Sequence, residues 1–421
     1  MHYAEAPPLY TGIPFIVLLL AIAILPLAAH KFWDKNRNKA IITAIIGIPA
    51  LIYLLGHYQA EMFHNIRDYF SFIILLGSLF IISGGILLTG DLRATPKVNT
   101  LFLLIGGVIA NVIGTTGASM LLIRPLLRTN CERKVTGHIP VFFIFVVSNI
   151  GGCLTPIGDP PLFLGYLRGV PFTWTLRLLP EWVVAMAIIL TIFYIWDRYA
   201  YRHEAVKDIR HDIAEIEPLR AKGTINFVFL AGVVLSVALQ IPGPYREIIM
   251  VAMTGLSLSL TRKDYRLANK FTYHPIAEVA ILFAGIFVTM VPLLIILHEK
   301  GAALGLTKQW QFFWATGGLS SFLDNAPTYL TFFSAAESVT AHMSAVGDIV
   351  AGVDSGLLRA ISCGAVFMGA NTYIGNGPNF MVKAISDEQC IKAPHFFGYM
   401  AYSGLILIPV FVIITLIFFR G

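Results

Sequence analysis

Long apolar segments follow one another along this chain at short intervals, and they constrain its fold more than any other feature. A stretch of about 20 apolar residues crosses the hydrocarbon core of a lipid bilayer. Charged residues make up only 13% of the chain, whereas about 25% is usual for a soluble domain. The expected membrane spans lie at 13–30, 39–57, 69–90, 138–168, 178–197, 224–241, 246–261, 275–297, 356–385 and 396–420. The sequence therefore predicts an all-α polytopic membrane protein.

Two further apolar regions, 98–128 and 302–337, are interrupted near their middles. Lys97 precedes the first region and Arg128 ends it, and short loops that carry Lys and Arg stay on the cytoplasmic side of a membrane. Both ends of this region should therefore be cytoplasmic, so that it enters the membrane and returns as a re-entrant hairpin. The second region is poor in basic residues, which favours a second hairpin that enters from the outside.

The distribution of basic residues predicts how the chain threads the membrane. The loop after the first span carries Lys31, Lys35, Arg37 and Lys39 and should be cytoplasmic. The N-terminus should then lie outside. Each half of the chain has five spans and one hairpin. Because five is odd, the halves enter the membrane in opposite senses, as inverted repeats do in many secondary transporters.

This count divides the chain into three parts. The first inverted repeat occupies 1–197 and the second occupies 224–421. A charged cytoplasmic connector, 198–223, joins the two repeats. The charged side chains of the connector, Glu204 among them, are expected to be solvated.

The spans at 138–168 and 356–385 carry sequences that a continuous helix cannot accommodate. The first contains SNIGGCLTPIGDPP from Ser148, and the second contains GANTYIGNGPN from Gly369. Proline removes a backbone donor and glycine weakens a helix, so each span should open into a broken helix. The backbone groups released there cannot face lipid and must face protein or a wet cavity.

The two breaks and the two hairpin tips align at similar offsets. Gly158 matches Gly375 at an offset of 217 residues, and Gly114 matches Asp324 at an offset of 210 residues. Similar offsets favour one duplication of the whole unit. A break that only kinked a helix for packing would need no counterpart in the other half, so the repetition favours a functional site.

Hairpin tips and helix breaks supply the oxygen atoms from which an ion site could be built. Carbonyl, carboxylate, amide and hydroxyl oxygens suit a hard cation such as sodium, whereas half-helix N-termini suit an anion. An acid within the membrane is a functional candidate by default. Asp159 and Asp324 are therefore predicted to bind sodium, the alternative being that backbone amides satisfy both carboxylates. The candidate ion- or substrate-binding residues are Asp159, Asp324, Asn325, Thr115, Thr116, Asn149, Asn371, Asn376 and Thr155.

Two of these motifs carry a resemblance to a known group of transporters. The run SNIGGCLTPIGDPPLFLG, from Ser148 to Gly165, and the run LDNAPT, from Leu323 to Thr328, resemble those of the ion transporter superfamily. The form is similar to NhaD-type sodium/proton antiporters and to related citrate or arsenite permeases. This resemblance implies a homodimer with a scaffold domain and a transport domain that moves like an elevator. The paired Ser-Asn-Thr tips of the sodium-coupled dicarboxylate carriers are absent, which favours cation exchange.

The sequence leaves two hypotheses about function open. The first is sodium/proton antiport by alternating access, in which sodium and protons compete for the same carboxylates. The second is sodium- or proton-coupled transport of a small anion, such as a carboxylate or an arsenite-like oxyanion. We expect no enzymatic activity, since the chain has no His-Glu-x-x-His motif, nucleophile elbow or P-loop.

The expected partners follow from the same reasoning. They are sodium, protons, the lipid bilayer and, under the second hypothesis, a small anion. No cofactor is expected, because sodium would be the substrate or the coupling ion. The basic residues serve topology and not nucleic-acid binding. The expected location is the inner (cytoplasmic) membrane, crossed many times.

Overall fold

The computed structural model describes residues 6–90, 92–204, 219–343, 347–389 and 391–420, and they form a mostly helical protein. In the first half the helices are η1 (Leu9–Gly12), α1 (Ile13–Ala28), α2 (His30–Trp33), α3 (Asn36–His57), α4 (Gln59–Ser83), α5 (Pro96–Thr129), α6 (His138–Val146), η2 (Ile150–Leu154), α7 (Pro160–Leu167), η3 (Phe172–Leu178) and α8 (Leu179–Arg202). In the second half they are α10 (Ile225–Ala238), α11 (Tyr245–Leu260), α12 (Lys263–Ala268), α13 (His274–Lys300), η4 (Gly301–Leu304), α14 (Gln309–Ser320), α15 (Asn325–Ala341), α16 (Ser355–Met368), η5 (Gly369–Asn371), α17 (Gly377–Glu388) and α18 (Phe396–Phe418).

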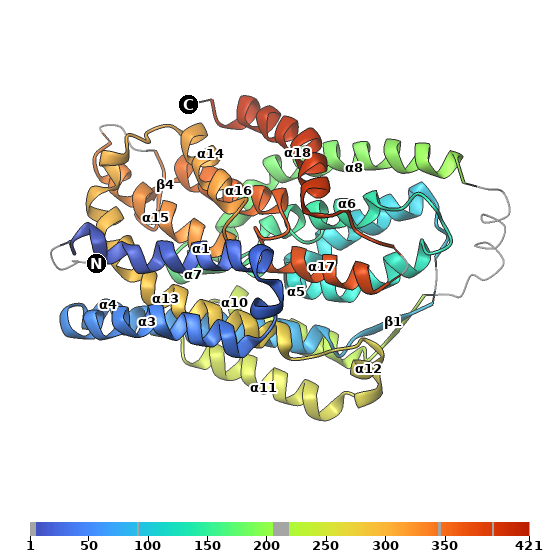
Figure 1. Ribbon diagram of the computed structural model, residues 1–421, viewed down its shortest axis with the longest axis horizontal. Coiled ribbons are helices and arrows are strands. Elements are labelled where there is room, and N and C mark those ends of the chain that lie inside the picture. The colour runs from blue at the N-terminus through green and yellow to red at the C-terminus, as the bar shows by residue number, and fades with distance from the viewer. Residues whose placement is uncertain (1–5, 91, 205–218, 344–346, 390, 421) are drawn as a thin grey trace.

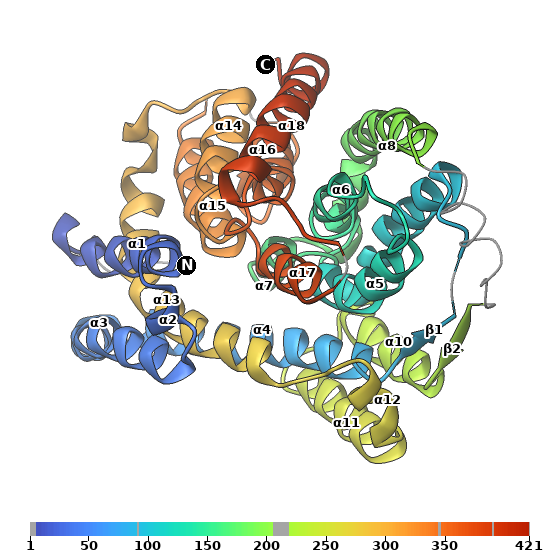
Figure 2. The ribbon, with the colours of Figure 1, turned by 45° about the vertical axis from the view of Figure 1, so that its right-hand side comes forward.

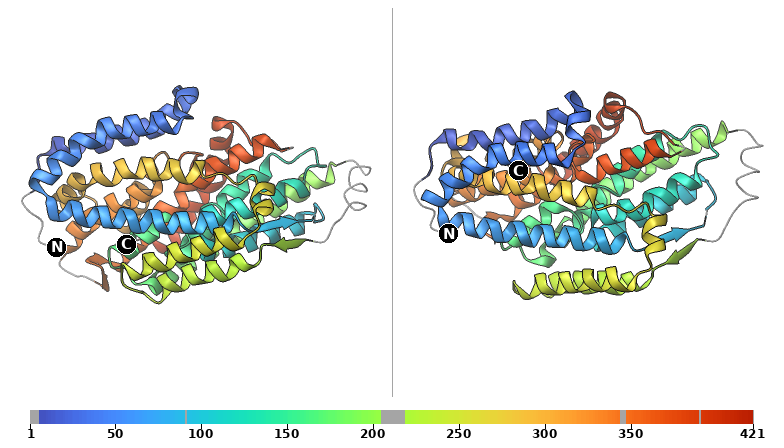
Figure 3. Two further views of the ribbon diagram at one scale, coloured as in Figure 1. Left: turned by 90° about the horizontal axis from the view of Figure 1, so that it is seen from below. Right: turned by 60° about the horizontal axis from the view of Figure 1, so that its bottom comes forward.

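Within the described residues, seven helical segments are long and apolar enough to cross a membrane. They are Leu9–Pro26, Asn36–His57, Gln59–Ser83, Pro96–Thr129, Phe172–Arg202, His274–Leu304 and Phe396–Phe418. Figure 1 and the two views of Figure 3 show that the long helices run in roughly one direction. The prediction of a polytopic all-α membrane protein is therefore confirmed.

The helices fall into a layer and a pair of bundles that rest on it. Helices α3, α4, α10, α11 and α13 pack side by side in the layer, along the lower edge of Figure 2. Above it, α5, α6 and α8 form one bundle, and α14, α15 and α16 form the other. Helix α18 contacts α8 of the first bundle and packs an aromatic side chain on α14 of the second. Helices α7 and α17 lie between the bundles, where α7 contacts α15 and α17 contacts α5.

Helix α5 is not straight but folds back on itself at Gly114. Gly114 has φ of 77° and ψ of 153°, a backbone conformation that favours glycine. The two arms of α5 then lie side by side. Asn99 in the first arm donates a hydrogen bond of 2.8 Å to Asn130, the residue just after the second arm. Those two residues are 31 positions apart, and a straight helix would hold them about 46 Å from each other.

The spans that the sequence predicts to be broken are interrupted in the structure. Helix α6 ends at Val146, and the chain passes through η2 before α7 begins at Pro160. Helix α16 ends at Met368, and the chain passes through η5 before α17 begins at Gly377. At the first break, Gly152 and Gly158 approach so closely that a Cβ on Gly158 would lie 2.1 Å from the Gly152 carbonyl oxygen. The two backbone segments can come this close only because both residues are glycine.

Three features of the helices and strands differ from the sequence-based expectations. Helix α4 begins at Gln59 and not at 69, because Asn65 and Asp68 in its polar first turns point into the protein and are buried. The chain after Ser83 leaves the helix and forms strand β1 (Leu87–Thr89), which pairs antiparallel with β2 (Arg220–Lys222) of the expected connector. A second two-stranded ladder, β3 (Ile349–Val350) with β4 (Val353–Asp354), precedes α16.

The expected connector is only partly described. Helix α8 continues into it as far as Arg202. Glu204, which we expected to be solvated, is 8% exposed, and its carboxylate accepts hydrogen bonds from the backbone N–H groups of Lys134 and Val135. The expectation was wrong for this residue because a loop 70 positions earlier in the chain closes over it. The connector residues 205–218 lie outside the described part of the chain.

The fold of α5 predicts that Lys97 and Arg128, both exposed, lie on the same side of the membrane. We would replace the native cysteines and introduce Lys97→Cys, Arg128→Cys or, as a control, Gln59→Cys at the opposite end of α4. An impermeant thiol reagent should label positions 97 and 128 from one side and position 59 from the other. Labelling of 97 and 128 from opposite sides would show that α5 crosses the membrane.

Candidate functional site

Asp159, which directly precedes α7, lies at the centre of the molecule with its side chain buried. Its Oδ1 atom accepts a hydrogen bond of 2.7 Å from the Thr115 hydroxyl and one of 3.1 Å from the Asn376 amide. Its Oδ2 atom accepts a hydrogen bond of 2.6 Å from the Asn325 amide. One carboxylate therefore joins both hairpin tips to the break in the second half. No Lys, Arg or His within the described ranges forms an ion pair with it.

Each of these residues stands at the start of a helix. Asp159 precedes α7, Asn376 precedes α17, and Asn325 is the first residue of α15. Thr115 begins the second arm of α5, directly after the turn at Gly114. Helix N-termini carry partial positive charge and favour a negative group. The Asp159 carboxylate therefore occupies the place where four helix N-termini converge.

The tips and the breaks are connected by backbone hydrogen bonds that match between the two halves. The Thr115 N–H donates to the Gly158 carbonyl oxygen at 2.7 Å, and the Asn325 N–H donates to the Gly375 carbonyl oxygen at 3.2 Å. Thr115 and Asn325 are 210 positions apart, and Gly158 and Gly375 are 217 apart, as in the alignment of the motifs.

The threonines of the two breaks also make matching bonds. The Thr155 hydroxyl donates to the Asn111 carbonyl oxygen at 2.5 Å, and the Thr372 hydroxyl donates to the Ser321 carbonyl oxygen. Each threonine oxygen then accepts a hydrogen bond from the glycine three residues later. Thr155, predicted as an ion ligand, thus has its hydroxyl engaged by backbone groups at the break.

Further side-chain amides bind the free backbone groups at the breaks, and the sequence analysis missed two of these residues. Asn149, which was predicted, donates 2.7 Å to the Oδ1 atom of Asn379, which was not. The Asn379 amide donates to the carbonyl oxygens of Gly369 and Thr372. Asn111, also missed, donates to the Gly151 carbonyl oxygen at 2.6 Å and accepts from the Leu154 N–H. The signal that could have found Asn111 is an isolated amide four positions before Thr115 in an apolar run.

Other predicted residues lie close to this centre without joining the Asp159 hydrogen bonds. The Asp324 side chain caps α15 by accepting a hydrogen bond of 3.0 Å from the Ala326 N–H. Asn371 donates to the Ser321 hydroxyl at 2.9 Å. The Thr116 hydroxyl is half-buried and forms no hydrogen bond with the described part of the chain.

Among the predicted site residues, two side-chain amide oxygens have no hydrogen-bond donor within the described ranges and are free to bind a ligand. The Oδ1 atoms of Asn325 and Asn371 are buried and accept no hydrogen bond from the residues that the structure describes. Those residues also contain no group of three or more His, Cys, Asp or Glu side chains arranged to bind a transition metal. The atoms available as ligands are carboxylate and amide oxygens, which suit a hard cation.

Comparison with known proteins places the chain in a family. A family profile described as "Putative citrate transport" matches residues 4–419. The chain belongs to that family. It is also 23% identical, over 93% of its length and 95% of theirs, to uncharacterized transporters of Mycobacterium bovis and Mycobacterium tuberculosis. This member of the family is therefore a transporter that spans the membrane several times.

The contrast between Thr115 and Thr116 yields a direct test of the site's geometry. Thr115→Val removes one donor from the buried Asp159 carboxylate. We expect the free energy of unfolding to fall by about 1.5–3 kcal/mol, the usual range for a hydrogen bond to a charged group. Thr116→Val, an identical change one position later, should alter it by less than about 0.5 kcal/mol. Unfolding of the purified variants in detergent measures both, and equal losses would contradict the assignment.

Proposed function

We propose that this transporter exchanges sodium ions for protons at a site centred on Asp159. The observation that supports this most strongly is a buried carboxylate whose donors among the described residues, Thr115, Asn325 and Asn376, are all uncharged. A carboxylate with a bound arginine would stay ionised, whereas one among neutral donors can be neutralised by a proton or by a cation. Desolvation disfavours leaving it ionised and alone. Competition of sodium and protons for this one group is sufficient to couple their movements.

Oxygen atoms around Asp159 would complete the sodium coordination. Asn325 donates to Asp159 through its amide nitrogen while its Oδ1 atom stays without a donor. The Oδ1 atom of Asn371 and the carboxylate of Asp324 lie on the side of the second hairpin. A sodium ion among these oxygens would offset the repulsion between the two carboxylates. Binding of a proton to Asp159 would release the sodium ion.

The architecture supports alternating access. The matched bonds at Gly158 and Gly375 favour two inverted repeats that share one site. In this arrangement α5 and the α14–α15 pair are re-entrant hairpins, and the layer of α3, α4, α10, α11 and α13 is the scaffold. We extend the proposal to a homodimer in the inner membrane with the N-terminus outside, whose bundles move against the scaffold like an elevator.

A second candidate function is coupled transport of a small carboxylate, and two observations favour it. The family description names citrate transport. Four helix N-termini converge on one point, as expected for an anion site. Against it, the Asp159 carboxylate already occupies that point, so that an incoming carboxylate would meet a negative charge. Cation exchange is therefore our first choice.

Transport assays on the two acids separate the candidates. The protein is placed in liposomes that contain a pH-sensitive dye, and sodium, lithium, potassium or citrate is added outside. Wild type should move protons when sodium is added, with no anion required. Asp159→Asn and Asp324→Asn should each reduce this response at least ten-fold. Asp348→Asn, which removes an exposed carboxylate paired with Arg177, should leave it unchanged.

The outcomes that contradict the proposal are specific. If wild type moves no protons on addition of sodium but accumulates labelled citrate in the presence of sodium, the second candidate is correct. If both Asn variants keep full transport of either kind, the carboxylates are structural and the site lies elsewhere.

A further inference from the structure

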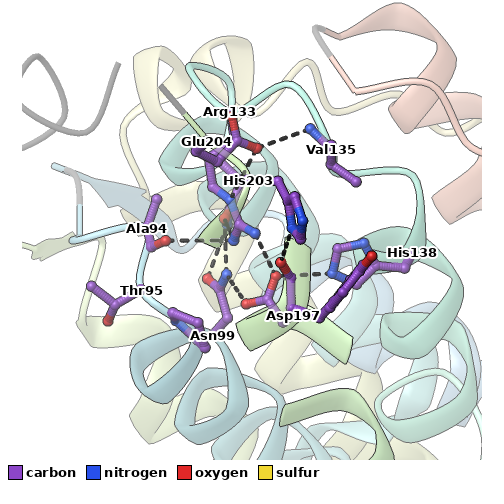
Figure 4. Close-up of polar contacts among 12 residues, drawn as sticks. Ala94, Thr95, Asn99, Arg133, Val135, His138, Asp197, His203 and Glu204 are labelled. Carbon is purple, nitrogen blue, oxygen red and sulfur yellow. Dashed lines mark hydrogen bonds and ion pairs between the residues drawn. The ribbon is translucent and has the colours of Figure 1, made fainter. Parts of the chain in front are cut away.

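Another buried aspartate, Asp197 near the end of α8, gathers charged and polar groups that are separate from those around Asp159 (Figure 4). Its Oδ1 atom accepts a hydrogen bond of 2.7 Å from Arg133 and lies 2.9 Å from the Nε2 atom of His138. Its Oδ2 atom accepts a hydrogen bond of 3.0 Å from the Asn99 amide. We call these residues, with Asn130, the Asp197 cluster.

The Asp197 cluster fastens the two ends of the α5 hairpin to each other. Asn99, in the first turn of α5, and Asn130, just past its last turn, exchange hydrogen bonds of 2.8 and 3.0 Å through their side-chain amides. Arg133 donates to the Asn130 Oδ1 atom at 3.2 Å. Because Asp197 binds both Asn99 and Arg133, both ends of the hairpin are held on α8 through one carboxylate.

Asp197 lies beside a positively charged partner. The Arg133 guanidinium pairs with Asp197 and lies 3.9 Å from the Glu204 carboxylate, which also accepts backbone N–H groups of the same loop. His138 faces Asp197, and α8 places the rings of Phe193 and Trp196 beside it. A buried pair of this kind adds little stability over apolar side chains, but breaking it leaves an unpaired charge. Such pairs serve best to fix one arrangement of the segments that they join.

The position of the hairpin base decides the position of its tip. Sixteen residues separate Asn99 from Thr115, which at 1.5 Å per residue puts the tip about 24 Å from the cluster. The arms between them are packed closely, since a Cβ on Gly106 of the first arm would lie 3.2 Å from Leu122 of the second. A slide of one arm along the other at the base would therefore carry Thr115 away from Asp159. A shift of 1 Å would break the 2.7 Å hydrogen bond between them.

We propose that the Asp197 cluster is a positioning device for the ion site, which holds the arms of the α5 hairpin in register so that Thr115 stays against Asp159. Asp197, Arg133 and Asn99 are positioning residues in this arrangement and touch no transported ion. The part of the inference that concerns sodium binding rests on the proposed function, whereas the part that concerns the hairpin tip does not.

The test compares Asp197→Asn with Asp264→Asn, a matched control whose carboxylate pairs with Arg262 in an exposed ion pair. Hydrogen exchange of backbone amides is measured by mass spectrometry on the purified proteins, and sodium half-saturation is measured in liposomes. In Asp197→Asn the amides of residues 111–119 should exchange at least ten-fold faster, and half-saturation should rise at least five-fold. Asp197→Glu should recover part of both effects, and Asp264→Asn should match wild type.

Asn99→Ala provides a second variant if Asp197→Asn does not fold. It removes three hydrogen bonds at the hairpin base, two with Asn130 and one with Asp197, while Arg133 stays paired with Asp197. It should also accelerate exchange at residues 111–119.

Exchange that rises equally over the whole chain, with sodium half-saturation unchanged, would show that the cluster only stabilises the protein and would overturn the inference. Unchanged exchange at the tip in both variants would overturn it as well. If wild type shows no sodium response, the proposed function fails, and exchange at the tip still decides the inference.

Discussion

The free backbone groups of two interrupted helices determine how the centre of this protein is built. A helix that stops in the interior of the molecule releases carbonyl and amide groups, which cannot face lipid and need other partners. Here the hairpin tips bind them instead. The Thr115 N–H donates a hydrogen bond to the Gly158 carbonyl oxygen, and the Asn325 N–H donates one to the Gly375 carbonyl oxygen. Each hairpin tip must therefore sit against a break, and the placement of the polar side chains around Asp159 follows from that contact.

The two halves share this backbone pattern but differ in charge, and the difference gives the site its chemistry. Asp159 in the first break corresponds to Asn376 in the second, and Gly114 at the first tip corresponds to Asp324 at the second. Because Asn376 is an amide, it can donate to Asp159 at 3.1 Å, where a second carboxylate would repel it. Two identical breaks could not have made this bond. The difference between the breaks leaves Asp159 as the acid that is hydrogen-bonded to residues of both halves.

The sequence was sufficient for the helices and for the breaks, because both depend on local composition. Apolar runs mark the spans, and the Gly and Pro residues around Gly158 and Gly375 mark the interruptions. The start of α4 was misplaced because its first turns are polar yet face protein and not water.

Partners that lie far apart in the chain could not be predicted in the same way. Nothing near Asn379 indicates that it binds Asn149, which is 230 positions away. Asp197 looked like the polar end of an ordinary span, since its partners Arg133 and Asn99 belong to another segment. Of the predicted site, Thr115, Asn325 and Asn376 meet at Asp159, whereas Thr116 does not. Which of two adjacent threonines faces the acid depends on the turn at Gly114, whose conformation only the structure shows.

Asp159 and Asp197, both buried, have surroundings that suit them to opposite tasks. Asp197 is bound by an arginine, and removing either partner of such a pair from a protein interior typically costs about 3–5 kcal/mol. That cost keeps Asp197 ionised and its partners in place, which makes it suitable for fixing a hairpin and unsuitable for carrying a proton. In the part of the chain that the structure describes, Asp159 has only neutral donors, and a hydrogen bond to a charged acceptor contributes about 1.5–3 kcal/mol. Under the proposed function, a proton or a sodium ion can compete with hydrogen bonds of this strength, because either one neutralises the carboxylate. The released donors can then bind other oxygen atoms. Under the proposed function, an aspartate therefore anchors the base of the α5 hairpin and another exchanges ions at its tip, and the arginine beside Asp197 makes the difference.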